Sequence, residues 1–105
     1  MNWEDAEKHC QGEGGHLASV HSAEENNFLT GMTKQMHWLG ATNLADVAVW
    51  VWSDGTAWDF TDWKANQPDN KDREKCLMRN WSGIQWNNGN CAALAFKYHV
   101  CKFAL

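Results

Sequence analysis

Four cysteines in a chain of 105 residues constrain this sequence more than any other feature. No two of them form a C-x-x-C pair, and the histidines show no H-x-x-x-H spacing, so we do not expect a structural metal site of cysteine and histidine. An even set instead indicates two disulfides and an oxidising compartment. The four are Cys10, Cys76, Cys91 and Cys101. They allow three pairings, and their positions alone do not choose among them.

Length and charge narrow the class of protein. We expect one domain over residues 1–105, with a core small enough to benefit from disulfides. The net charge of -4 leaves no basic excess, which argues against a nucleic-acid partner. No apolar run approaches the ~20 residues of a membrane span. No signal sequence follows Met1, so we expect either the mature protein or a fragment of it.

Two short helices are predicted in the first third of the chain. Asn2 can cap a helix over residues 3–10, and Gly12, Gly14 and Gly15 end it. Ser22 and Glu25 have the spacing of a capping box, so a second helix is expected to start there. That helix carries an apolar stripe, expected to pack in the core, formed by Phe28, Leu29, Met32 and Met36.

Short strands and one long loop are predicted after Trp38. Segments 38–40 and 49–52 are β-prone. Residues 59–75 are polar and irregular, and a stretch of this length is usually functional or disordered. Three further β-prone segments follow at 76–78, 84–86 and 95–103. Helices followed by short strands around a long loop indicate an α+β fold.

Side-chain oxygens gather in the second half of the chain. The residues that carry them are Gln67, Asp69, Glu74, Asn87 and Asn88. Carboxylate and amide oxygens suit a hard cation such as Ca²⁺, which takes 6–8 oxygen ligands. An ion with coordination positions left over could also accept hydroxyl groups of a ligand. Composition alone favours a plainer interpretation, a polar surface loop with ordinary turn residues.

The order of short motifs resembles the C-type lectin-like domain over almost the whole chain. These motifs are Trp3–Glu7 leading to Cys10, Gly15–Ser22 with Glu24–Glu25, Trp38–Gly40, Trp52–Gly55, Trp63, Gln67–Asp69, Trp86–Asn88 and Cys91. Each motif is weak alone, and the ordered set is specific. Residues 67–70 and 76–78 look most like fish lectins and the related type II antifreeze proteins. The resemblance implies an α+β fold of two helices, small antiparallel sheets and a long calcium and ligand loop. The tryptophans expected to pack in its core are Trp38, Trp52, Trp63 and Trp86.

The resemblance also implies the disulfide pairing and the main site. It pairs Cys10 with Cys101 and Cys76 with Cys91, and it places a cis peptide bond before Pro68. It implies Ca²⁺ as the cofactor and a carbohydrate as the partner, with two vicinal sugar hydroxyls completing the coordination. The implied metal ligands are Gln67, Asp69, Glu74, Asn87 and Asn88, and the first four also contact the sugar. In the family, the Gln-Pro-Asp order is associated with galactose-type ligands.

Two departures from the family pattern concern this site. Asn88 stands where the family has an aspartate, which removes one negative charge and predicts weaker calcium binding. Galactose sites usually offer an aromatic ring to the sugar's apolar face, but no aromatic residue follows Asp69 within the loop. Trp81 is the candidate that could serve instead, so the galactose preference is a leaning.

A third departure lies at the ends of the chain. The chain opens directly at the first helix, where the family has a strand that pairs with the C-terminal one. Segment 98–105 is therefore expected to present an open edge, which another copy could cover to give a homo-oligomer. Residues 80–82 read Asn-Trp-Ser, a formal glycosylation sequon, so we note Asn80 as a possible acceptor in a secreted protein.

The leading interpretation is a secreted, calcium-dependent carbohydrate-binding module. No catalytic motif and no pairing of a base with a nucleophile is visible in the sequence, so we do not expect an enzyme. One alternative is an ice-binding protein on the same scaffold, although such relatives usually carry ten cysteines. The other is a calcium-independent protein-binding domain, which Asn88 in place of aspartate makes credible.

Overall fold

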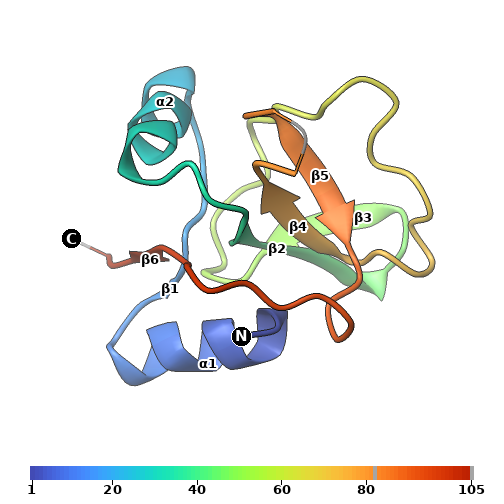
Figure 1. The fold of residues 1–105 in the computed structure, drawn as a ribbon. Coiled ribbons are helices and arrows are strands. Elements are labelled where there is room, and N and C mark those ends of the chain that lie inside the picture. Colours follow the sequence, from blue (N-terminus) through green and yellow to red (C-terminus); the bar gives the residue numbers. More distant parts are fainter. Residues whose placement is uncertain (82, 105) are drawn as a thin grey trace.

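The computed structural model describes residues 1–81 and 83–104. Its elements are α1 (Trp3–Gly12), β1 (His16–Leu17), α2 (Ala23–Met32), β2 (His37–Asp46), β3 (Val49–Trp52), β4 (Cys76–Arg79), β5 (Trp86–Gly89) and β6 (Cys101–Lys102). Two helices with small antiparallel sheets confirm the predicted α+β class (Figure 1). The last predicted strand was too long, because only two residues of segment 95–103 pair with another strand.

Two antiparallel sheets organise the molecule. The larger has the order β3-β2-β4-β5, and the smaller consists of β1 and β6 (Figure 1). In the β4–β5 pair, Leu77 lies opposite Asn88 and Met78 lies opposite Asn87. This register places the two predicted asparagine ligands beside the start of β4, directly after the loop that carries Glu74.

Both helices begin at the predicted caps. The Asn2 side chain accepts a hydrogen bond of 3.0 Å from the backbone N–H of Asp5. The Ser22 hydroxyl accepts one of 3.1 Å from the backbone N–H of Glu25. The Glu25 carboxylate reaches back one residue further than in a standard capping box and accepts from the backbone N–H of His21 at 2.8 Å. The capping predictions are therefore confirmed.

Only Leu29 of the apolar stripe predicted for the second helix packs in the core, and Met36 lies beyond the end of α2. Leu29 is 5% exposed, whereas Phe28 is 69%, Met32 is 55% and Met36 is 40% exposed. The helix lies at one end of the molecule (Figure 1) and turns only a narrow face inward. Polar contacts hold that face instead: the buried Arg79 donates to the Thr30 hydroxyl at 2.7 Å. The stripe prediction was right for Leu29 and wrong for Phe28, Met32 and Met36, because periodicity cannot distinguish a covered face from an exposed one.

The predicted core tryptophans are confirmed. Trp38, Trp52 and Trp86 are buried, and Trp63 packs against the cluster that contains Trp52 and Trp86. The rings of Trp52 and Trp86 meet edge-to-face with centroids 5.8 Å apart, a favourable arrangement for aromatic pairs. Because Trp86 begins β5, this packing also fixes the strand that carries Asn87 and Asn88.

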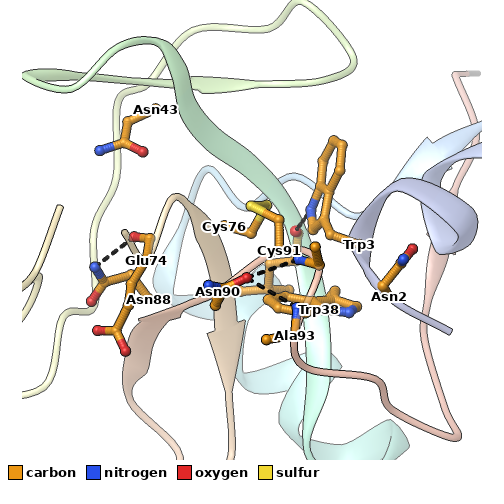
Figure 2. Close-up of a disulfide and its surroundings, with 12 residues drawn as sticks. Asn2, Trp3, Trp38, Asn43, Glu74, Cys76, Asn88, Asn90, Cys91 and Ala93 are labelled. Atoms are coloured by element: carbon orange, nitrogen blue, oxygen red, sulfur yellow. Dashed lines mark hydrogen bonds between the residues drawn. A yellow bond between two sulfur atoms is a disulfide. The ribbon is translucent and has the colours of Figure 1, made fainter. Parts of the chain in front are cut away.

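The two disulfides join distant parts of the chain. Cys10 on α1 is bonded to Cys101 on β6, and Cys76 on β4 is bonded to Cys91 just after β5. This is the pairing that the family resemblance implies. The backbone N–H of Trp3 donates to the carbonyl of Cys91 at 3.2 Å, so the first turn of α1 rests on the second disulfide (Figure 2).

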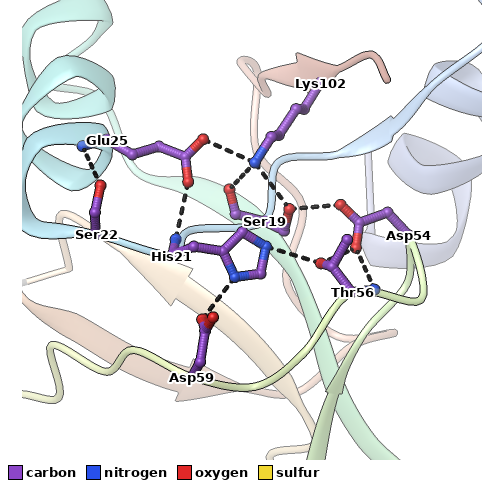
Figure 3. Close-up of polar contacts among 8 residues, drawn as sticks. All are labelled: Ser19, His21, Ser22, Glu25, Asp54, Thr56, Asp59 and Lys102. Atoms are coloured by element: carbon purple, nitrogen blue, oxygen red, sulfur yellow. Dashed lines mark hydrogen bonds and ion pairs between the residues drawn. The ribbon is translucent and has the colours of Figure 1, made fainter. Parts of the chain in front are cut away.

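A polar network links β6, α2 and the start of the long loop (Figure 3). Lys102 pairs with Glu25 at 2.7 Å and donates to both the backbone and side-chain oxygens of Ser19. The Ser19 hydroxyl in turn donates to Asp54. These contacts tie the C-terminal strand to α2 and, through Ser19, to Asp54 after β3.

Candidate functional site

The five predicted ligand residues line one pocket of about 280 Å³. These are Gln67, Asp69, Glu74, Asn87 and Asn88. The remaining lining residues are Asn70, Met78, Trp81, Gly89, Asn90 and Leu94. The structure thus brings together side chains from the long loop, from β5 and from the β4–β5 connection.

The backbone of β5 anchors the first part of the long loop. The N–H of Trp86 donates to the carbonyl of Asp62 at 2.8 Å, and its own carbonyl accepts from Lys64 at 2.9 Å. The N–H of Gln67 then donates to the carbonyl of Lys64 at 2.9 Å. The peptide bond between Gln67 and Pro68 is cis, as the resemblance implies. These contacts bring the side chains flanking the proline to the pocket.

Asp69 and Glu74 bring two carboxylates together in the pocket. Burial raises the pKa of the Glu74 carboxyl, and the hydrogen bond and negative charge of Asp69 raise it further. Two neighbouring carboxylates repel each other when both are ionised, so one retains its proton more readily. A cation between them would relieve that repulsion.

Asn87 contributes a buried amide with unused hydrogen-bonding capacity. The residue is 6% exposed and lines the pocket. Its Nδ2 atom has no hydrogen-bond partner among the residues that the structure describes. Buried amides are normally paired, so an unpaired donor at a pocket wall is a position where a ligand atom would be favourable.

Asn88 is also 6% exposed, and its amide forms hydrogen bonds to the loop through both its oxygen and its nitrogen. Its Nδ2 donates to the backbone carbonyls of Asp69 and Glu74, the latter at 2.8 Å (Figure 2). Its Oδ1 accepts from the backbone N–H of Asp69 at 3.2 Å. Asn88 therefore braces the two acidic residues through their backbones.

Two bracing asparagines were missed by the sequence analysis. Asn43 on β2 is completely buried and donates to the backbone carbonyl of Lys71 at 3.1 Å, which ties the loop to the sheet. Asn90 accepts from the backbone N–H groups of Ala92 and Ala93 and orders the turn after β5 (Figure 2). Nothing near Asn43 in the sequence indicates this role, because its partner lies 28 residues away.

Two other candidates lie outside this pocket. Cys10, Cys101 and His99 lie close together, but the two cysteines form a disulfide and cannot act as thiolate ligands. The sequon asparagine, Asn80, donates its amide N–H to the backbone carbonyl of Gln35 at 3.0 Å. Ser82, the third residue of the sequon, lies outside the described residues.

Comparisons with known proteins place the chain in a family. The family described as the lectin C-type domain matches residues 1–103. The galactose-specific lectin nattectin of Thalassophryne nattereri is 36% identical over 98 residues, which cover 87% of this chain and 62% of nattectin. An alpha-N-acetylgalactosamine-specific lectin of Patiria pectinifera is 40% identical over 116 residues, covering 97% of this chain and 68% of that lectin.

Solved structures agree with the sequence comparisons. The structure of herring type II antifreeze protein matches with a TM-score of 0.88 and 35% identity, covering 96% of this chain and 81% of that chain. Within the described part of the chain, neither helix is long and apolar enough to cross a membrane. The family match and the two lectin relatives identify a binding domain rather than a catalytic one. The chain belongs to the C-type lectin domain family.

Proposed function

We propose that residues 1–105 act as one carbohydrate-recognition domain that binds its sugar through a loop-bound Ca²⁺ ion. The observation that carries the proposal is the convergence of five oxygen-bearing side chains on one pocket. The proposed metal ligands are Gln67, Asp69, Glu74, Asn87 and Asn88, and the first four also contact the sugar.

The donor set fits a calcium ion. Carboxylate and amide oxygens are the ligands that Ca²⁺ prefers, and an ion would neutralise the facing charges of Asp69 and Glu74. The unpaired Nδ2 of Asn87 is a donor suited to a sugar hydroxyl beside the ion. Bound calcium would supply coordination positions for two neighbouring hydroxyls. With Asn88 in place of an aspartate, only two carboxylates remain, which predicts weaker binding than in a site with three.

A galactose-type ligand is the finer part of the proposal. The order Gln67, Pro68 and Asp69 supports it, and so do the specificities for which the two lectin relatives are named. Trp81 lines the pocket and is 54% exposed, so part of its ring is accessible to a ligand. An exposed indole ring can stack on the apolar face of a sugar.

Ice binding is the second candidate, because the chain is similar to a type II antifreeze protein over 96% of its length. The four cysteines weigh against it by comparison with the ten usual in such relatives. A third candidate is calcium-independent protein binding through the same surface.

We place the protein outside the cell, since two disulfides persist in oxidising compartments. Its C-terminal strand supports a possible homo-oligomer. β6 pairs with β1 on one side, and no other strand within residues 1–81 and 83–104 joins that sheet. Analytical ultracentrifugation tests this point, and a monomer at high concentration would exclude self-association through the edge.

Calorimetry tests the proposed function. Calcium is titrated first, and galactose and mannose are then titrated in calcium and in EDTA. We expect calcium to bind in the range of about 0.1–1 mM that is typical of extracellular modules, and galactose to bind only in calcium. Absence of calcium binding at millimolar concentration would exclude the proposal. Thermal hysteresis in a freezing assay would favour ice binding instead.

A matched pair of variants tests whether the Trp81 ring contacts the sugar. Trp81→Ala should weaken galactose binding about tenfold, within the range expected for an aromatic contact, and leave calcium binding unchanged. Phe28→Ala, at an exposed aromatic on α2, should leave both unchanged.

A further inference from the structure

The amide of Asn88 makes three hydrogen bonds to the ligand loop and uses both of its ends to do so. Its Oδ1 and Nδ2 pair with the N–H and the carbonyl of the same residue, Asp69. Its second N–H is donated to the carbonyl of Glu74 at 2.8 Å (Figure 2). One side chain on β5 therefore spans the loop segment that carries both acidic residues of the pocket.

Across the described residues, the other backbone contacts that hold this segment do not reach the backbone of Asp69. Within it, the N–H groups of Arg73 and Glu74 both donate to the carbonyl of Asn70 at 2.8 Å, which closes a local turn. From outside, Asn43 donates to the carbonyl of Lys71 at 3.1 Å. The Asp69 end of the segment depends on Asn88, since both backbone groups of Asp69 are paired with it.

An aspartate at position 88 could not make the same contacts. A carboxylate has no N–H group, so it would face the carbonyl oxygens of Asp69 and Glu74 without donating to either. Asn88 itself is 6% exposed, so a carboxylate at this position would be poorly hydrated, and the two carbonyls would lose this donor. An aspartate would be tolerated there only with a cation close enough to neutralise it.

We propose that Asn88 is a positioning residue that holds the 69–74 segment in its ligand-binding arrangement when no metal is bound. The amide supplies internally the cross-link between loop and sheet that an ion would otherwise provide. Compared with an aspartate, Asn88 lacks one negative charge, which lowers the calcium affinity. In return its amide keeps the metal-free loop ordered. The inference rests on the proposed function only in taking the pocket to bind calcium and a sugar. The ordering of the loop does not depend on it, because the hydrogen bonds of Asn88 require no ion.

Amide hydrogen exchange in EDTA tests the proposal on the whole chain. The reporter is the N–H of Asp69, which donates to Asn88. We expect this N–H to be protected in the wild type and its protection to fall about tenfold or more in Asn88→Asp and in Asn88→Ala. Near-UV circular dichroism of the buried tryptophans should stay unchanged in Asn88→Ala, which shows that the fold persists.

The matched control is Asn90→Asp, two residues further along. It adds the same charge at the edge of the same pocket. Among the described residues the Asn90 side chain only accepts hydrogen bonds, from Ala92 and Ala93, and a carboxylate keeps both. Asp69 should stay protected in this variant. Equal protection of Asp69 in wild type and Asn88→Asp would overturn the inference. Calcium is then added to the wild type and to Asn88→Asp. If it changes the amide exchange of neither protein, while Asn88→Asp still loses protection in EDTA, the calcium site is excluded and the role of Asn88 stands.

Discussion

The carboxylate of Glu7 on α1 accepts a hydrogen bond of 2.9 Å from the backbone N–H of Leu17 on β1. It also accepts from Gln11 and His16 at 2.7 Å and from the Ser53 hydroxyl at 2.9 Å. Burial alone would raise the pKa of Glu7, but these four hydrogen bonds together hold it below its usual value. An ionised, 5% exposed carboxylate thus joins the first helix, the first strand and the turn after β3.

Glu7→Gln should destabilise the protein by about 2 kcal/mol, because the new NH₂ group faces donors that need an acceptor. Urea unfolding near neutral pH measures the loss. Glu4→Gln on the same helix is the control: it removes only an exposed pair with Lys8 and should cost less than about 0.5 kcal/mol. Equal effects of the two variants would contradict the role assigned to Glu7.

The same carboxylate predicts a contribution to acid sensitivity. A carboxyl whose pKa is lowered in the folded state stabilises the protein above its unfolded pKa near 4.5, and this contribution is lost as the pH falls through the folded value. Wild type should therefore lose more stability than Glu7→Gln below about pH 4.5. Parallel stability curves for the two proteins would exclude this assignment.

Local signals in the sequence predicted the features that depend on a few adjacent residues. The caps at Asn2 and Ser22 are of this kind, since a side chain there pairs with a backbone group three residues on. The pocket residues were reached differently. Their gathering depends on the β4–β5 register. Composition grouped residues 67–74 with Asn87 and Asn88 but favoured an ordinary polar loop, and the family resemblance turned this group into a predicted site.

Features that depend on distant contacts were not predicted. The exposure of Phe28 follows from how little of α2 the rest of the chain covers, which no local pattern records. The amide of Asn88 was expected to supply a metal ligand, and its backbone partners depend on the path of a loop 14 to 19 residues away. Sequence thus indicates which groups are available, and the fold decides which partners they meet.

His37 predicts a second pH effect in a different range. It is fully buried on β2, and burial lowers the pKa of its imidazole, as does the charge of the neighbouring Arg79. A base whose folded pKa lies below its unfolded value of 6.5 favours unfolding as it takes up a proton, so stability falls as the pH drops below that value. His37→Gln should flatten the stability curve between about pH 7 and 5, measured by thermal unfolding. If the slope of stability against pH is the same in His37→Gln and in the wild type, groups other than His37 cause the pH dependence.

Loss of the two disulfides should have different effects on stability and on calcium binding. Cys10 and Cys101 are 91 residues apart, and replacing both with alanine should cost about 4.5 kcal/mol in the chain-entropy account. Cys76 and Cys91 are 15 residues apart, and their replacement should cost about 3 kcal/mol. Only the second pair flanks the pocket, so only its loss should weaken calcium binding in the folded protein. Guanidinium unfolding and calcium titration separate these effects, and equal calcium affinities in the two double variants would count against the bracing role.

Glu74 predicts how calcium binding depends on pH. Burial and the adjacent Asp69 raise the pKa of Glu74 above its ordinary 4.5, so protons compete with the ion at a higher pH than at an exposed glutamate. Calcium affinity, measured by calorimetry at several pH values, should therefore decline before the pH reaches 4.5.

Substitution at Glu74 isolates this effect. Glu74→Gln should weaken calcium binding at neutral pH, since one of two carboxylates is lost, and should also remove most of the pH dependence. Glu24→Gln, in the exposed first turn of α2, removes the same charge away from the pocket and should change neither. An affinity that declines with the same pH profile in wild type and Glu74→Gln would show that Glu74 does not hold the ion.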